Sequence, residues 1–312
     1  MKWSASNGDR IKAQMHLDSI QWENEILRDF HGSIEWKSNA FTGQIHVRDS
    51  MHRLLSEWSG RLRNGTFERL IGQGNIDLQI PKNPEFKGPL RVMGNFVYQD
   101  TGNMIQAKLS NGLLLANDHQ LNLEHAEVTI QNGPNIPVIR LTINRDSVHC
   151  SGILSKNQFA RVYDQVFNYI FENSPSPSPE PEIPFRTYVN VQNLNDYLPF
   201  FSRPPVSRCE QFVGTMQWSR NQYALDSSWN RVIRANLGMP VWKNWAAQSA
   251  VLVSESFGPS LLAILDVNRL THDGTDLFRQ VHYQQVRANQ SSSIRLEGKD
   301  SAETSSALFV GS

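Results

Sequence analysis

Cysteine, charge of one sign and long apolar runs are all scarce in this sequence. Its 312 residues include only two cysteines, Cys150 and Cys209, which excludes a disulfide scaffold and a four-thiolate zinc site. The two thiols either pair between the halves of the chain or are both buried and free, as isolated cysteines usually are. Lys plus Arg balances Asp plus Glu at 30 each, so we expect no nucleic-acid partner.

The most apolar stretch, residues 260–266, is far shorter than the ~18 residues that a membrane-spanning helix needs. The first residues lack the apolar centre of a signal peptide. The chain also begins without a capping or turn signal and ends in a polar tail. We therefore expect a soluble fragment of a longer protein.

Sequence motifs for catalysis are missing too. There is no Gly-x-Ser-x-Gly elbow, and neighbours His149 and Cys150 would point to opposite faces of a strand. The nine histidines are scattered, mostly on polar faces, and the run from His272 to Gly274 is typical of a turn. We expect no catalytic residue, metal site or cofactor.

Alternation of period two dominates the sequence. Apolar residues alternate with polar ones in 13–17, 76–80, 105–109 and 121–130, and Asn-Gly or Asp-Gly pairs recur between such segments. Strict alternation predicts antiparallel strands with one apolar and one wet face, and these pairs predict hairpin turns, Asn111-Gly112 among them. The pattern predicts about nine strands over 11–153, more strands after 188, and a short helical turn at 193–201.

Two helices are also predicted. Spacing of 3.6 residues favours an amphipathic helix at 155–172 and, less strongly, one at 49–63 with Met51, Leu54, Leu55 and Trp58 on one stripe.

Five prolines fall in 174–184, which is typical of an extended linker. We predict a β-meander half over 1–173 ending in the first helix, a Pro/Ser linker over 174–184, a second β-rich half over 185–298 and a flexible tail over 299–312. The fold class is mainly β: an extended antiparallel sheet or curled β-groove in two similar halves, with one or two covering helices.

An internal echo links the halves. Gly32-Ser-Ile-Glu-Trp36 with Asn39 and Phe41 matches Gly214-Thr-Met-Gln-Trp218 with Asn221 and Tyr223, and Gly94-Asn-Phe-Val-Tyr98 is a looser third copy. Each copy predicts a hairpin in which glycine opens the strand and asparagine takes the turn. We favour duplication over chance.

Two groups of residues are candidate binding positions. The alternating apolar face supplies candidates for an apolar groove: Ile76, Leu78, Ile80, Leu121, Leu123, Val128 and Ile130. The same residues would serve equally well in a sealed sandwich or against the helix at 155–172. Aromatic residues crowd a second region, where they form either a carbohydrate platform or a core: Trp218, Tyr223, Trp229, Trp242 and Trp245.

The long series of amphipathic strands, with hairpins of the Gly-Ser-Ile-x-Trp and Gly-Asn-Phe-x-Tyr kind, resembles the AsmA-like group of bacterial envelope proteins, including those of the TamB type. The resemblance covers most of 11–298 in style. It implies an inner-membrane-anchored parent in the periplasm or envelope, whose apolar β-groove carries phospholipid or another acyl-chain ligand between membranes or assists outer-membrane assembly with other envelope proteins. The family's N-terminal membrane helix is absent here, and the proline linker interrupts the array.

Three hypotheses follow. The first is a non-enzymatic lipid-conducting segment, which needs an open apolar face. The second is a β-rich module that binds glycans or proteins through exposed aromatic rings. The third is a polysaccharide hydrolase with converging carboxylates, a pair that spacing cannot reveal.

Overall fold

The computed structural model describes the chain except for residues 1, 7–9, 23–24, 49–51, 64–65, 81–85, 133–136, 153–183, 203–205, 221–228, 258–259, 289–290, 301–305 and 312. The fold is mainly β and antiparallel, as predicted. Two compact units divide it: unit 1 comprises Met1–Gly133, Arg140–Asn144 and Pro199–Arg203, and unit 2 comprises Pro134–Ile139, Arg145–Leu198 and Pro204–Ser312. The predicted helix at 155–172 and all but the last residue of the predicted linker at 174–184 lie outside the described residues.

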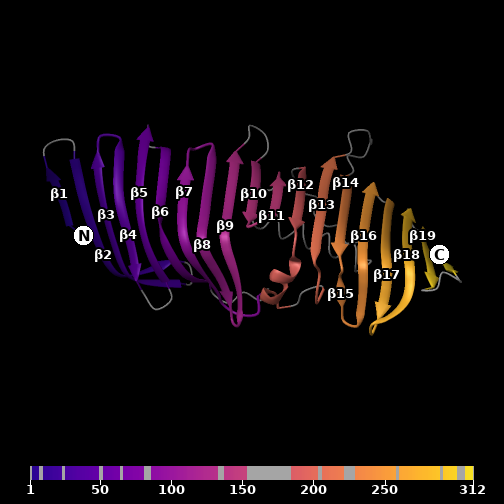
Figure 1. Ribbon diagram of the computed structural model, residues 1–312. Coiled ribbons are helices and arrows are strands. Elements are labelled where there is room, and N and C mark those ends of the chain that lie inside the picture. Colours follow the sequence, from indigo (N-terminus) through magenta and orange to yellow (C-terminus); the bar gives the residue numbers. More distant parts are fainter. Residues whose placement is uncertain are drawn as a thin grey trace. The chain divides into compact units, whose positions relative to one another are not determined.

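Unit 1 is a meander in which each strand from β1 to β9 pairs antiparallel with the next (Figure 1). Part of a further strand, β10 (Pro137–Ile143), also belongs to it. The strands are β1 (Lys2–Ser6), β2 (Arg10–Trp22), β3 (Glu25–Lys37), β4 (Ala40–Arg48), β5 (His52–Arg63), β6 (Thr66–Ile80), β7 (Leu90–Asp100), β8 (Met104–Ala116) and β9 (His119–Asn132).

Unit 2 continues the same architecture, with pairing between sequence neighbours except that β14 pairs with β16 across the short β15. Its strands are β11 (Asp146–Ser151), β12 (Phe185–Val191), β13 (Gln211–Arg220), β14 (Trp229–Gly238), β15 (Val241–Trp242), β16 (Trp245–Phe257), β17 (Ser260–His272), β18 (Thr275–Ala288), β19 (Ser291–Asp300) and β20 (Ser306–Gly311). Two 3-10 turns, η1 (Leu194–Asp196) and η2 (Leu198–Phe200), confirm the helical turn predicted at 193–201.

The helix predicted at 49–63 is wrong, because the described part of this segment is strand β5. Leu54 and Trp58 lie on one face in either structure, so the 3.6-residue spacing was ambiguous. Leu55, however, points to the other face, where it is 55% exposed. β5 pairs along its length with both β4 and β6. The hydrogen bonds of these two ladders outweigh the helical preference suggested by a short apolar stripe.

The structure corrects one of the predicted hairpin turns and confirms another. Asn111 and Gly112 lie inside β8, where Asn111 has φ 49°, and the pairing of β7 with β8 shifts register between Met93 and Asn95. A bulge uses the same positive φ as a tight turn, so the motif alone cannot tell them apart. The turn predicted from His272 to Gly274 is confirmed, with φ 50° at Asp273 and 76° at Gly274.

The internal echo is visible as a shared strand geometry. In β3, Gly32, Ile34 and Trp36 lie on one face, and the ring of Phe30 covers Gly32 so closely that a Cβ there would be 3.2 Å from it. In β13, Phe212 covers Gly214 in the same way, at 2.9 Å. The glycines therefore lie within their strands and do not open them, contrary to the prediction.

Candidate functional site

The register of unit 1 gathers apolar side chains onto one face of its sheet. Leu78 lies opposite Val92, Val92 opposite Leu114, and Leu114 opposite Leu121. A second row runs from Gly72 through Tyr98 and Ala107 to Val128. Six of the predicted groove residues therefore have described side chains in the same sheet, and the side chain of Ile80 lies outside the described residues.

We define the unit 1 apolar face by the register partners that share this side. Towards the N-terminal strands, each row continues with the same kind of side chain. The members from β2 to β6 are Ile11, Ala13, Met15, Leu17, Phe30, Gly32, Ile34, Trp36, Phe41, Gly43, Ile45, Val47, Leu54, Ser56, Trp58, Gly60, Leu70, Gly72, Gly74, Ile76 and Leu78. None of these residues is charged, although by register Arg28, opposite Ser19, and Asp100, opposite Leu70, lie on the same side at strand ends.

The alternation that creates this face slips by one between Leu123 and Ala126, and the structure absorbs the slip. Asn111 opposes this part of β9 from the bulge in β8. From the turn after β10, the Asn144 side chain donates to the carbonyl of Asn122 and accepts from the backbone N–H of His125. Apolar residues thus stay on one side of the sheet along the whole of β9.

Glycines and aromatic rings interlock on the apolar face. A Cβ at Gly72 would lie 2.5 Å from the Trp58 ring, and one at Gly60 would lie 2.4 Å from the Phe41 ring. The rings therefore lie flat across the neighbouring strand. Ser56, fully buried among them, is satisfied: Trp58 Nε1 donates to its hydroxyl at 2.8 Å.

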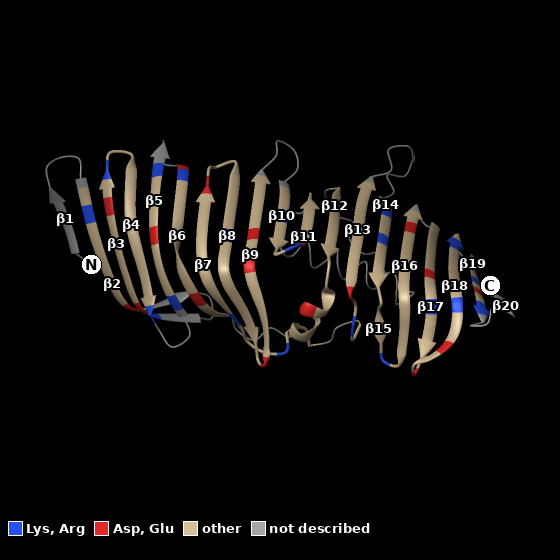
Figure 2. Cartoon of the chain, in the orientation of Figure 1, with Lys and Arg blue, Asp and Glu red and all other residues tan. Residues whose placement is uncertain are grey.

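The opposite face of unit 1 is polar and joined by ion pairs between adjacent strands. Lys12 pairs with Glu35 at 3.1 Å, and Arg91 pairs with Asp77 at 2.7 Å. Figure 2 shows that residues of both charge signs are distributed over the strands of each unit. The sheet is thus amphipathic, with these ion pairs on its polar side.

The described strands contact their ladder neighbours along their length, and the whole chain exposes 20518 Å², compared with ~13,000 Å² for a compact protein of this mass. On the apolar face, Ile11 is 49% exposed and Ile34 38% exposed, whereas Phe41, Val47, Leu121 and Leu123 are buried. The described strands form an open sheet whose apolar face is exposed in part.

The aromatic candidates of unit 2 do not gather in one place. Trp218 is 2% exposed and stacks on Phe185, with ring centroids 5.0 Å apart. Trp242 and Trp245 face each other across the β15–β16 turn and are half-buried. Tyr223 and the side chain of Trp229 lie outside the described residues.

The two cysteines are free and buried. Burial raises the pKa of the Cys150 thiol and of the Cys209 thiol, and the Cys209 thiol also donates to the carbonyl of Gln211 at 3.1 Å. Cys150 and His149 point to opposite faces of β11, as expected from alternation. A neutral buried thiol is a poor nucleophile.

One cluster was missed by the interpretation of the histidines as scattered. His16, His31 and His46 are cross-strand neighbours on the polar face of β2, β3 and β4. Successive histidines are 15 residues apart in the sequence, which is not the spacing of a recognisable metal-binding motif. Aligning 10–22 with 25–37 as a hairpin would have revealed the first pair.

No family model matches the chain, and neither the curated proteins nor the solved structures contain a match to it. Among the described residues, no helix has the length and apolar character required to cross a membrane.

Proposed function

We propose that this chain is a non-enzymatic segment of a bacterial envelope protein, whose unit 1 apolar face binds or conducts phospholipid or another acyl-chain ligand. The observation that carries the proposal is the continuity of the face, which extends across β2 to β9 and keeps apolar residues such as Ile11 and Ile34 exposed. The strand texture that resembles AsmA-like proteins supports the same function.

The energetics favour an acyl ligand. Each methylene that leaves water for an apolar surface contributes ~0.8 kcal/mol, so a chain of ordinary length gains several kcal/mol without any specific polar contact. The rings of Trp58 and Phe41, which lie close over Gly72 and Gly60, add aromatic surface to this face. Such binding needs no catalytic residue or cofactor, because the surface itself is the functional element.

The proposal places the chain in the periplasm or associated with the envelope, in a parent protein anchored in the inner membrane. Its partners are membrane phospholipid and other envelope proteins that deliver or receive it. Assistance of outer-membrane assembly is part of the same proposal, since lipid supply and assembly use the same apolar path.

A lipid-loading experiment tests the proposal. The purified chain is incubated with phosphatidylethanolamine and phosphatidylglycerol vesicles that contain a fluorescent acyl-labelled phospholipid, repurified, and assayed for bound label. Ile34→Glu places a charge on the apolar face at a 38% exposed position, and Leu55→Glu places one on the polar face at a 55% exposed position.

We expect the wild-type chain to retain lipid, Ile34→Glu to lose most of it, and Leu55→Glu to retain it. The proposal is overturned if the wild-type chain retains no lipid, or if the two variants lose it equally. Circular dichroism of each variant verifies that the sheet is intact.

A further inference from the structure

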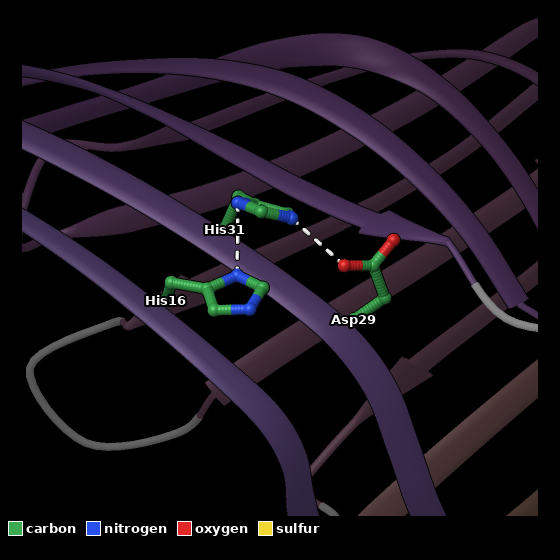
Figure 3. Close-up of side chains that lie close together, drawn as sticks. All are labelled: His16, Asp29 and His31. Atoms are coloured by element: carbon green, nitrogen blue, oxygen red, sulfur yellow. Dashed lines mark hydrogen bonds and ion pairs between the residues drawn. The ribbon is translucent and has the colours of Figure 1, made fainter.

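Two histidine–aspartate pairs lie on the polar side of β2 and β3, and Figure 3 shows His31 between Asp29 and His16. His31 Nε2 lies 2.8 Å from Asp29 Oδ1, and His16 Nε2 lies 3.3 Å from Asp18 Oδ1. Between the two rings, His16 Nδ1 and His31 Nδ1 are 3.1 Å apart. Both rings therefore have a carboxylate on the outside and each other on the inside.

The carboxylates determine which nitrogen of each ring carries hydrogen. An ionised carboxylate only accepts hydrogen bonds, so each Nε2 is held as an N–H donor. Each Nδ1 then keeps a lone pair, and the two Nδ1 atoms are 3.1 Å apart on rings whose centroids are 4.2 Å apart and whose planes are tilted by 40°. A proton shared by the two nitrogens or a metal ion bound by both would suit this arrangement.

The separation fits a metal ion. Zinc–imidazole bonds of ~2.0–2.1 Å in a tetrahedral site place neighbouring nitrogens ~3.3 Å apart. A carboxylate that accepts from the outer N–H of a metal-binding histidine is the usual support of such ligands, because it orients the ring and raises its basicity. His16 and His31 are each provided with one.

Further potential ligands lie beside the pair. Ligand atoms of His16, Asp29 and His31 all fall within 4.8 Å of one another, and His46 is next in the row, its ring centroid 6.2 Å from that of His31. A cavity of about 690 Å³ adjoins the three histidines, and none of its described lining residues is Lys or Arg. A divalent cation would therefore not be repelled by a lysine or arginine among these residues.

The backbone explains how the aspartates reach the rings. Asp29 has φ 51°, and the paired residues of β2 and β3 are in register on both sides of Asp18 and Asp29, which do not themselves pair. Because residues two apart in a strand share a face, Asp18 and Asp29 lie on the same side of the sheet as His16 and His31.

We infer that His16 and His31 form a binding site for one divalent transition-metal ion that prefers imidazole, such as Zn²⁺, with Asp29 and Asp18 as supporting groups. Imidazole and carboxylate ligands suit zinc, copper and nickel and are poor for thiolate-selective metals. The site lies on the polar face and does not depend on the proposed lipid function.

Calorimetric titration of the full chain with ZnCl₂ tests the inference. We expect one equivalent to bind to the wild-type chain, and His31→Gln and His16→Gln each to weaken binding by at least ~10-fold. Asp29→Asn, which removes the support and leaves both imidazoles, should weaken it by ~10–100-fold. His282→Gln is the matched control, since His282 also pairs with a carboxylate, Asp266.

Loss of binding in the His16 and His31 variants, with normal binding in His282→Gln, supports the site. Absence of zinc binding to the wild-type chain overturns the inference and leaves a proton shared between the rings. Equal loss in His282→Gln overturns it as well, because binding would then be general to strand histidines. The zinc-induced rise in melting temperature is a second readout, which must disappear in the same two variants.

Discussion

The same alternating texture produces different apolar faces in the two units. In unit 1 the face is continuous, and its charged residues by register, Arg28 and Asp100, lie near strand ends. In unit 2 the buried residues form separate clusters, one around Trp218 and one around Val267. Buried Thr187, Ser254 and Ser256 and, by register, Arg231 and Arg287 lie on the corresponding face of unit 2. A period-two pattern therefore specifies strands, while the side chains in each row decide whether the result is a surface or a set of small cores.

The largest difference between the units should appear when a tryptophan is removed. Trp218→Ala in unit 2 empties a nearly fully buried site and should lower the free energy of unfolding by ~3–5 kcal/mol. Trp36→Ala in unit 1 removes a half-buried ring that stacks on Phe41 and should cost ~1–2 kcal/mol. Urea denaturation followed by circular dichroism measures both, and equal costs would contradict the contrast.

The second largest difference should come from adding a methyl group at one glycine of each unit. A Cβ at Gly74 in unit 1 would lie 2.0 Å from the carbonyl oxygen of Leu55, so Gly74→Ala must move backbone and should cost ~1–3 kcal/mol. At Gly298 in unit 2 the nearest atom is 3.5 Å away. Gly298→Ala should therefore be neutral or stabilise the chain by ~0.4–1 kcal/mol. Thermal melts measure both variants, and an equal loss of stability would contradict the expected difference between these two glycines.

The two units should also differ in how strongly a charge on the apolar face reduces lipid retention. Ile34→Arg in unit 1 and Leu296→Arg in unit 2 change residues that are 38% and 41% exposed on the apolar faces of their units. We expect retention of labelled phospholipid to fall several-fold in the first variant and little in the second. The reverse order would assign lipid contact to unit 2.

The smallest effect concerns pH. Paired hydrogen bonds from Arg91 lower the pKa of Asp77 below its usual 3.8. The pair therefore stabilises the fold fully above that ordinary value, and the contribution is lost as the pH falls through the lowered pKa. Asp77→Asn should reduce the free energy of unfolding by under ~1 kcal/mol at neutral pH, since Arg91 is half exposed.

This difference between wild type and variant should vanish in acid, which urea denaturation at several pH values can follow. Asp276→Asn is the counterpart in unit 2, where Arg269 lowers the pKa of Asp276. Because Asp276 lies beside the turn that begins β18, we expect a smaller effect there. A difference for Asp77→Asn that persists in acid would mean that the side chain acts through packing and not through its charge.

Alternation was sufficient to predict the strands and the shared face of Leu78 and Leu121, because period two has one structural solution when both neighbours are strands. It failed at β5, where 3.6-residue and two-residue spacing overlap, and at Asn111, where a bulge imitates a turn. Alternation could not predict the His16–His31 pair, because cross-strand proximity depends on register, and register is a property of the completed hairpin.

Confinement of packing to ladder neighbours has a consequence for how such a chain is built and lengthened. When each strand depends on only the next one, stability accumulates as a sum of local terms, and a hairpin inserted anywhere alters two interfaces at most. Folding can start at any hairpin and spread outwards, without waiting for distant segments to meet. The number of strands, and with it the distance over which an apolar path extends, is then free to vary by duplication.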